Sequence, residues 1–308
     1  MEMRKKGEWL DISVPKEWRG NTIEYILKTF WKTPRKLLHQ IRMTKGVKLN
    51  GEVKPWHTVL SEGDRLHVHL FPPEPLGIEP QFIELDILYE DDHALVVNKP
   101  AGMRVHPTSE EQTDTLDHAV AFHFQTSGVE AKVRHVHRLD QDTTGAVLYA
   151  KHALAGAILG RLLEKKKIAR TYVALVEGKV KQKSGLIRQP IGKDRHHATR
   201  RRVSSTGTMA VTHFQVLDYD PDHDLTLMHV QLETGKTHQI RVHMNHLGHP
   251  LLGDTLYGGD RDTTGHHALH AAKLTFLHPI SYEEITCVAP FQEASQMFDY
   301  DLDHYLNS

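Results

Sequence analysis

The sequence predicts an α+β protein whose main sheet is mixed and largely antiparallel. Strand-like and helix-like segments follow one another without the regular alternation that builds a parallel sheet. A stretch with four prolines between residues 72 and 80 divides the 308 residues into a short and a long part. We therefore expect a small domain over residues 1–72, a stiff linker over 73–82 and a large domain over 83–308.

The short part is predicted to contain helices followed by strands. Apolar residues recur at helical spacing over residues 22–32. Thr33 is expected to cap a second helix that has Pro34 at its first position. Asn50-Gly51 is typical of a hairpin turn, so a strand should follow the second helix and then reverse.

The long part mixes short strands with two helices. The strands are indicated by apolar or alternating runs and the helices by apolar stripes at helical spacing. The expected strands cover residues 85–90, 94–99, 172–176, 210–217 and 226–232, and the expected helices cover residues 114–124 and 154–167.

Composition restricts the class of protein. An apolar content of 39% and a charged content of 25% are ordinary for a globular chain. The single cysteine, Cys287, excludes an internal disulfide and a cysteine-based zinc site. None of the 25 histidines has further ligands at a convincing spacing, so we expect no metal. The sequence shows no signal peptide, membrane span, Walker A loop or dinucleotide-binding turn, which favours a cytoplasmic protein without a cofactor.

The net charge of −1 hides an asymmetry along the chain. Residues 1–70 carry 14 basic against 8 acidic side chains, and residues 71–208 carry 20 against 17. Residues 209–308 carry 4 against 14. A polyanion such as RNA would therefore be attracted to the first two segments and repelled by much of the third.

The most informative stretch is His137-Arg138-Leu139-Asp140-Gln141-Asp142-Thr143-Thr144-Gly145. The apolar residues 146–150 follow it, so Asp140 is expected where a loop leads into a buried strand. A carboxylate at a turn often does no more than accept hydrogen bonds from backbone N–H groups. The local pattern alone therefore leaves Asp140 as either a capping residue or a catalytic one.

This stretch resembles the His-Arg-Leu-Asp-x-x-Thr-Ser-Gly motif of the RluA/RluD family of pseudouridine synthases, with Thr144 in place of the usual Ser. Thr keeps the hydroxyl group and can make the same local hydrogen bonds. Other similar segments stand in the family's order, and their number leaves little room for coincidence. They are Asn98-Lys99-Pro100-Ala101-Gly102 with His106-Pro107, Ala169-Arg170-Thr171-Tyr172, residues 234–243, residues 248–254, and Leu269-His270-Ala271.

The resemblance implies which residues form the active site. Asp140 matches the catalytic aspartate, and Arg241 matches the cation that keeps it ionised, in an expected bidentate pair. Tyr172 matches the active-site tyrosine, whose ring can stack on uracil and whose hydroxyl can serve the proton step at C5. Arg138 resembles the arginine that enters the space left by the flipped nucleotide.

Residues 12–72 resemble the αL RNA-binding module, the S-four-type domain of ribosomal proteins. Such a module presents cations to RNA phosphates, although a small basic domain can also serve folding alone. Two further basic clusters lie near the expected active-site motifs. The expected RNA contacts are Arg35, Lys36, Arg42, Lys45, Lys48, Arg138, Lys165, Lys166, Lys167, Arg170, Arg200, Arg201 and Arg202.

We therefore expect a monomeric RNA pseudouridine synthase, with large-subunit ribosomal RNA preferred over transfer RNA as its substrate. A non-catalytic RNA-binding protein is an alternative, but the combination of Asp140, Tyr172 and Arg241 argues against it. A glycoside hydrolase using Asp140 and Asp142 is another, because two residues along a strand approach the spacing of an inverting carboxylate pair. The Thr-Thr-Gly turn and the basic surroundings argue against that second alternative.

Overall fold

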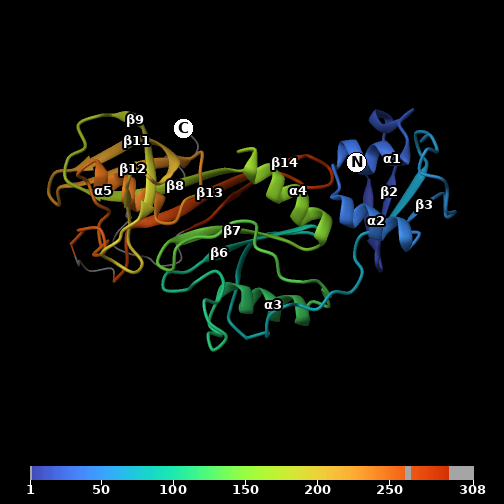
Figure 1. The fold of residues 1–308 in the computed structure, drawn as a ribbon, viewed down its shortest axis with the longest axis horizontal. Coiled ribbons are helices and arrows are strands. Elements are labelled where there is room, and N and C mark those ends of the chain that lie inside the picture. The colour runs from blue at the N-terminus through green and yellow to red at the C-terminus, as the bar shows by residue number, and fades with distance from the viewer. Residues whose placement is uncertain (1, 261–264, 291–308) are drawn as a thin grey trace.

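A computed structural model describes residues 2–260 and 265–290, so residue 1 of the predicted small domain and residues 261–264 and 291–308 of the predicted large one lie outside the described residues. The elements form a four-stranded sheet near the N-terminus and a ten-stranded sheet in the rest of the chain (Figure 1). Neighbouring strands of both sheets are antiparallel, with one parallel pair in the larger sheet. The predicted α+β class with a largely antiparallel sheet is confirmed.

The smaller sheet combines strands from both ends of the first 69 residues. Its spatial order is β1 (Met3–Lys6), β2 (Trp9–Ser13), β4 (Arg65–His69) and β3 (Val47–Leu49). Its helical elements are a 3-10 turn (Lys16–Trp18), α1 (Ile23–Tyr25), a π-helical continuation (Ile26–Phe30) and α2 (Arg35–Met43). Asn50 and Gly51 both have positive φ angles, 52° and 84°, as the predicted hairpin turn requires.

The start of α2 differs by one residue from the prediction. Pro34, not Thr33, is the N-cap, because the Pro34 carbonyl accepts the first helical hydrogen bond, from the N–H of Leu38 (2.9 Å). The Thr33 hydroxyl is buried and has no hydrogen-bond partner among the described residues. Thr33 therefore does not cap the helix.

The larger sheet has the spatial order β10-β9-β11-β12-β8-β13-β7-β6-β5, with β14 paired to β13. The predicted strands and helices are all present, with ends shifted by a few residues. The strands are β5 (Asp86–Glu90), β6 (Ala94–Lys99), β7 (Thr144–Ala150), β8 (Ala169–Glu177), β9 (Ser184–Lys193), β10 (Arg201–Val203), β11 (Thr208–Asp220), β12 (Leu225–Leu232), β13 (Leu269–Leu277) and β14 (Glu284–Val288). The helices are α3 (Leu116–Thr126), α4 (Ala153–Glu164) and α5 (Gln239–His246).

Two helices cover opposite faces of the sheet around β6 and β7 (Figure 1). Along β6, Ala94 and Val96 belong to the apolar layer that contains α4, whereas Leu95 and Val97 belong to the layer that contains α3. This alternation follows from the two-residue period of a strand and explains why β6 is apolar on both faces. Within the described ranges, no helix is long and apolar enough to cross a bilayer.

The proline-rich segment lies along the larger part of the protein. Its Glu74 N–H donates to the carbonyl of Glu130, and its Leu76 carbonyl accepts from the N–H of Val133. Glu74 also pairs with Arg134 at 2.6 Å. These contacts hold the segment against the larger part.

The N-terminal module, residues 3–69, also packs directly against the larger part. The Trp31 side chain is fully buried, and its indole N–H donates to the carbonyl of Ile280 (3.4 Å). The guanidinium of Arg161 donates to the carbonyls of Trp31 and Lys32, and the Tyr282 hydroxyl donates to that of Phe30. One continuous apolar cluster includes side chains from both parts. Burial of apolar surface therefore joins the module to the larger part, in addition to the linker.

Gly145 is required where β7 leaves the loop that carries Asp140. Its φ angle is +107°, and a Cβ atom there would collide with the backbone of Ala271 on β13. We expect Gly145→Ala to lower the free energy of unfolding by about 2 kcal/mol or more. As a control, Gly160→Ala on α4 meets no atom within 4 Å and should stabilise by about 0.5–1 kcal/mol. Urea unfolding of both variants checks this, and equal stabilities would contradict it.

Candidate active site

Asp140 lies in the loop that leads into β7. The Thr143 N–H donates to the carbonyl of Asp140 (3.2 Å) and closes a turn. The hydroxyls of Thr143 and Thr144 lie 2.7 Å from His267 Nε2 and His270 Nδ1, so the loop is fastened to β13 and the segment before it. Thr144 stands in place of the usual Ser of the motif. It makes this contact through its hydroxyl, which is the group that Thr and Ser have in common.

Lys99 fastens the same loop from the other side. Its ammonium group is fully buried and donates to the carbonyls of Pro100, Met103 and Gln141, each at 2.8 Å. Burial lowers the pKa of Lys99 to about 7, although neighbouring carboxylates favour its charged form. Gln141 directly follows Asp140, so Lys99 positions the backbone beside the carboxylate. The sequence contained Lys99 in a matching segment but offered no role for it.

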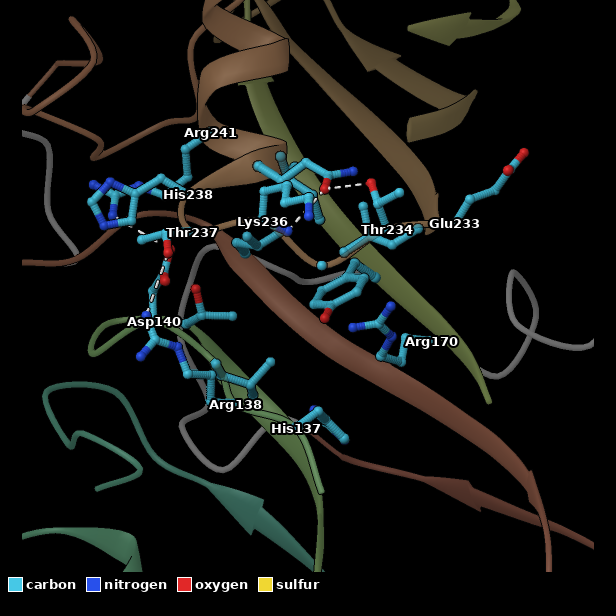
Figure 2. Close-up of a pocket in the computed structure, with 18 of the residues that line it drawn as sticks. His137, Arg138, Asp140, Arg170, Glu233, Thr234, Lys236, Thr237, His238 and Arg241 are labelled. Carbon is cyan, nitrogen blue, oxygen red and sulfur yellow. Dashed lines mark hydrogen bonds and ion pairs between the residues drawn. The ribbon is translucent and has the colours of Figure 1, made fainter. Parts of the chain in front are cut away.

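A cavity of about 460 Å³ opens beside Asp140, a size typical of small-ligand pockets. It is lined by the Asp140 loop, by the start of β8 with Arg170 and Tyr172, and by the segment from Thr234 into α5. Figure 2 shows Asp140 on one side of this cavity and Arg170 on the other. Within the described part of the chain, no group of three or more His, Cys, Asp or Glu residues could hold a metal ion.

Arg241, which also lines the cavity, does not form the predicted bidentate pair with Asp140. Its Nε and Nη2 donate to the two carboxylate oxygens of Asp254, each at 2.7 Å. Its Nη1 lies 3.7 Å from Asp140 Oδ2, at the limit of an ion pair. The edge of the guanidinium formed by Nε and Nη2 can pair with only one carboxylate at a time. In this structure it pairs with Asp254, which is more deeply buried than Asp140. Asp254 therefore orients Arg241, which reaches Asp140 through one nitrogen.

Tyr172 lies in the same cavity and is almost completely buried. Burial raises the pKa of its hydroxyl, Arg170 opposes this shift, and the charge of Asp140 adds to it. The phenol therefore stays protonated near pH 7. The structure thus brings Asp140, Tyr172 and Arg241 together around one cavity.

His238 is a cavity residue to which the sequence assigned no role. It precedes α5 in the left-handed conformation (φ 58°, ψ 23°), which is unusual for a residue other than glycine. Its Nδ1 lies 2.9 Å from the Tyr257 hydroxyl, and that hydroxyl accepts the N–H of Arg201 (2.8 Å). Burial lowers the pKa of His238, so a neutral imidazole lies near Asp140.

The match to a known family covers the residues that line this cavity except Leu269. Residues 93–246 match the RNA pseudouridylate synthase family. The uncharacterized RNA pseudouridine synthase YhcT of Bacillus subtilis is 47% identical over 289 residues, which cover 94% of this chain and 96% of the relative. The chain belongs to the RNA pseudouridine synthase family.

Other comparisons concern the N-terminal part of this pseudouridine synthase and its chain as a whole. Residues 10–66 match the RluD ribosomal pseudouridine synthase N-terminal domain. The ribosomal large subunit pseudouridine synthase D of Vibrio parahaemolyticus is 38% identical over 281 residues, which cover 86% of this chain and 85% of the relative. The solved structure of human RNA pseudouridylate synthase domain containing 1 superposes with a TM-score of 0.60 at 26% identity, covering 75% of this chain and 96% of that one.

The basic residues expected to contact RNA fall into two groups in this pseudouridine synthase. Arg138, Lys166 and Arg170 line the cavity itself. The others lie outside it, on the N-terminal module, after α4 and on β10 with the residue before it. Those outside it are Arg35, Lys36, Arg42, Lys45, Lys48, Lys165, Lys167, Arg200, Arg201 and Arg202.

The pairing of Arg241 predicts the outcome of a mutant cycle. Arg241→Met strands the buried Asp254 carboxylate, so we expect the free energy of unfolding to fall by about 3–5 kcal/mol. Adding Asp254→Asn should restore part of this loss because the stranded charge is removed, whereas adding Asp140→Asn should restore little. Urea unfolding of the single and double variants measures both couplings. A larger rescue by Asp140→Asn would mean that Asp140 is the main partner of Arg241.

Proposed function

We propose that this pseudouridine synthase isomerises a uridine of large-subunit ribosomal RNA and that Asp140 is its catalytic carboxylate. The observation that carries the proposal is the cavity that Asp140 shares with Tyr172 and Arg241. The Vibrio relative named for the ribosomal large subunit supports the choice of RNA. All three cavity residues come from one chain, so we propose a monomer, which would work in the cytoplasm where ribosomes are assembled.

The reaction is an isomerisation and requires no redox cofactor or external energy source. The bond between ribose C1′ and uracil N1 breaks, the base turns, C5 bonds to C1′, C5 loses its proton and N1 gains one. We propose that Asp140 serves this sequence as an anion, with Nη1 of the Arg241 guanidinium 3.7 Å from its carboxylate. Asp254 keeps that guanidinium in place while the base turns.

Arg138 is proposed to replace the flipped uridine in the RNA. Its side chain is exposed at the edge of the cavity, and its contact with the Thr237 hydroxyl is long, at 3.4 Å. A weakly held guanidinium can move into the gap that base extrusion leaves and offset part of the loss of stacking. The basic residues outside the cavity are proposed to contact phosphates, which sets affinity and salt dependence.

Tyr172 is proposed to stack on the uracil and to take part in the proton step at C5. We expect Tyr172→Phe to leave KM within about threefold, because the stacking ring remains, and to lower kcat by about 100-fold. Single-turnover kinetics on an RNA substrate separates the two effects. An unchanged kcat would reduce Tyr172 to a packing and stacking residue.

Mapping of pseudouridines in total RNA tests the proposed function. A strain that lacks this protein should lose pseudouridine at defined uridines of large-subunit ribosomal RNA and regain it when the wild-type chain is supplied. Purified protein should produce the same modification in a transcript of that region. Loss of pseudouridine from transfer RNA alone would reassign the substrate, and no change in any RNA would overturn the function.

A further inference from the structure

A second cavity of about 460 Å³ adjoins the first along the Asp140 loop. Tyr172 and Arg170 line only the first cavity, whereas Arg104 and His106 line only the second. The proposed reaction places the target uridine in the first cavity and gives the second no role. The residues that line both cavities are Arg138, Leu139, Asp140, Thr237, His238 and Arg241.

One wall of the second cavity is the imidazole ring of His106. A face of this ring stacks on His135, with the centroids 5.3 Å apart and the planes at 16°, and His135 is outside the cavity lining. His135 Nδ1 in turn donates to the buried carboxylate of Asp117 (3.0 Å), which holds the stacked pair in place. Of the two faces of the His106 ring, the one that does not contact His135 is the one left for a ligand in the cavity. Burial lowers the pKa of His106, so this surface is uncharged near pH 7.

Two guanidinium groups border the same cavity and have no carboxylate partner among the described residues. Arg104 Nε donates to the side-chain carbonyl of Gln141 (3.1 Å), and Arg138 Nη2 donates to the Thr237 hydroxyl (3.4 Å). Arg104 also donates to the Thr108 hydroxyl. All of these partners are neutral groups, so both cations remain available to an anion. Arg241 differs, because Asp254 already neutralises it.

We propose that the second cavity binds the nucleotide next to the target uridine, with its base stacked on His106 and a phosphate held by Arg104. The proposal rests on the proposed function, since the target must occupy the first cavity. Flat side chains that stack on bases, with cations along the backbone, are the general means of binding single-stranded RNA. The wall shared by the two cavities lets one strand that crosses Arg138 and Asp140 reach both.

The test uses a synthetic RNA stem-loop around the uridine that the mapping experiment identifies. Two further RNAs carry an abasic residue immediately before or immediately after the target. Wild-type KM should rise about tenfold for one of these two abasic RNAs, which corresponds to about 1.4 kcal/mol. His106→Leu, which fills the space without a flat ring, should raise KM about tenfold on the intact RNA and should add nothing on that abasic RNA. His106→Phe should restore most of the loss.

His223→Ala is the matched control, because His223 is an exposed histidine that lines neither cavity. It should leave KM unchanged on all three RNAs. Equal KM values of the wild type on intact and abasic RNAs would overturn the subsite even if His106→Leu fails to fold. A loss in His106→Leu that is the same on every RNA would overturn it as well. In either case, conversion of the intact RNA by the wild type would leave the proposed function standing.

Discussion

Asp140→Asn is expected to lower the rate of uridine isomerisation on the order of 10³-fold or more while the protein stays folded. Asparagine has nearly the shape of aspartate but no charge, so the reaction loses its anion. The fold should survive because Asp254, and not Asp140, forms the bidentate pair with Arg241. RNA binding should persist too, since the cations around the cavity are unchanged.

Asp142→Asn is the matched control in the same loop. Asp142 lines the second cavity but not the one that contains Tyr172, so the rate at saturating RNA should remain near that of the wild type. Release of tritium from C5-labelled uridine in RNA measures the rate, and thermal melting confirms that both variants fold. An active Asp140→Asn variant would remove Asp140 from the chemistry. Equal losses in both variants would instead indicate a paired-carboxylate reaction.

The second large expected effect is a loss of stability in mild acid, because several histidines are buried in neutral form. Burial lowers the pKa of His93, His243 and His270 to about 4 and that of His137 to about 3. In the unfolded chain each would titrate at its ordinary value of about 6.5. Below that pH the unfolded state therefore takes up protons that the folded state does not, and the folded state becomes less stable.

The four shifts together predict a fall in the free energy of unfolding on the order of 5 kcal/mol between pH 7.5 and pH 5.5. Carboxylates with lowered pKa values, such as Asp11, lose their stabilising contribution only at more acidic pH. The fall in stability between pH 7.5 and pH 5.5 therefore comes from the histidines. Urea unfolding at half-unit steps of pH measures the slope. His243→Gln should reduce that slope by about one proton. The exposed His223→Gln should not reduce it, because the hydrogen bond to the Asp220 carboxylate raises the pKa of His223 instead of lowering it. A stability that is flat from pH 7.5 to 5.5 would contradict the prediction.

Local sequence patterns predicted most of the secondary structure because they report on the chain's own periodicity. The strands β6 and β12 and the helices α3 and α4 appeared from apolar spacing alone, within a few residues. The strands β9, β10, β13 and β14 of the larger sheet were not predicted. β9 and β14 contain more exposed than buried positions, so their burial follows no clear alternation of residue types. β13 is largely buried, and only its first residues, Leu269-His270-Ala271, had been singled out, as a motif and not as a strand.

The candidate active site was predicted through motifs, and its residues meet in one cavity. Asp140, Tyr172 and Arg241 lie in three separate segments of the chain. The resemblance to a family predicted that they act in one site. The contribution of Lys99 and His238 was not visible, because each acts through contacts with distant backbone or side chains.

By itself, the sequence determined the class of fold, the positions of the strongly periodic elements and the side chains Asp140, Tyr172 and Arg241, since these follow from local periodicity and from motifs. Only the tertiary structure decided which partners these side chains have. Asp254 takes the two-nitrogen edge of Arg241, and Gly145 meets the backbone of Ala271, because pairing depends on distances and directions between segments far apart in the chain. Spacing along one segment does not encode those directions. The pairings therefore depend on how β7, β13 and α5 pack in the folded protein.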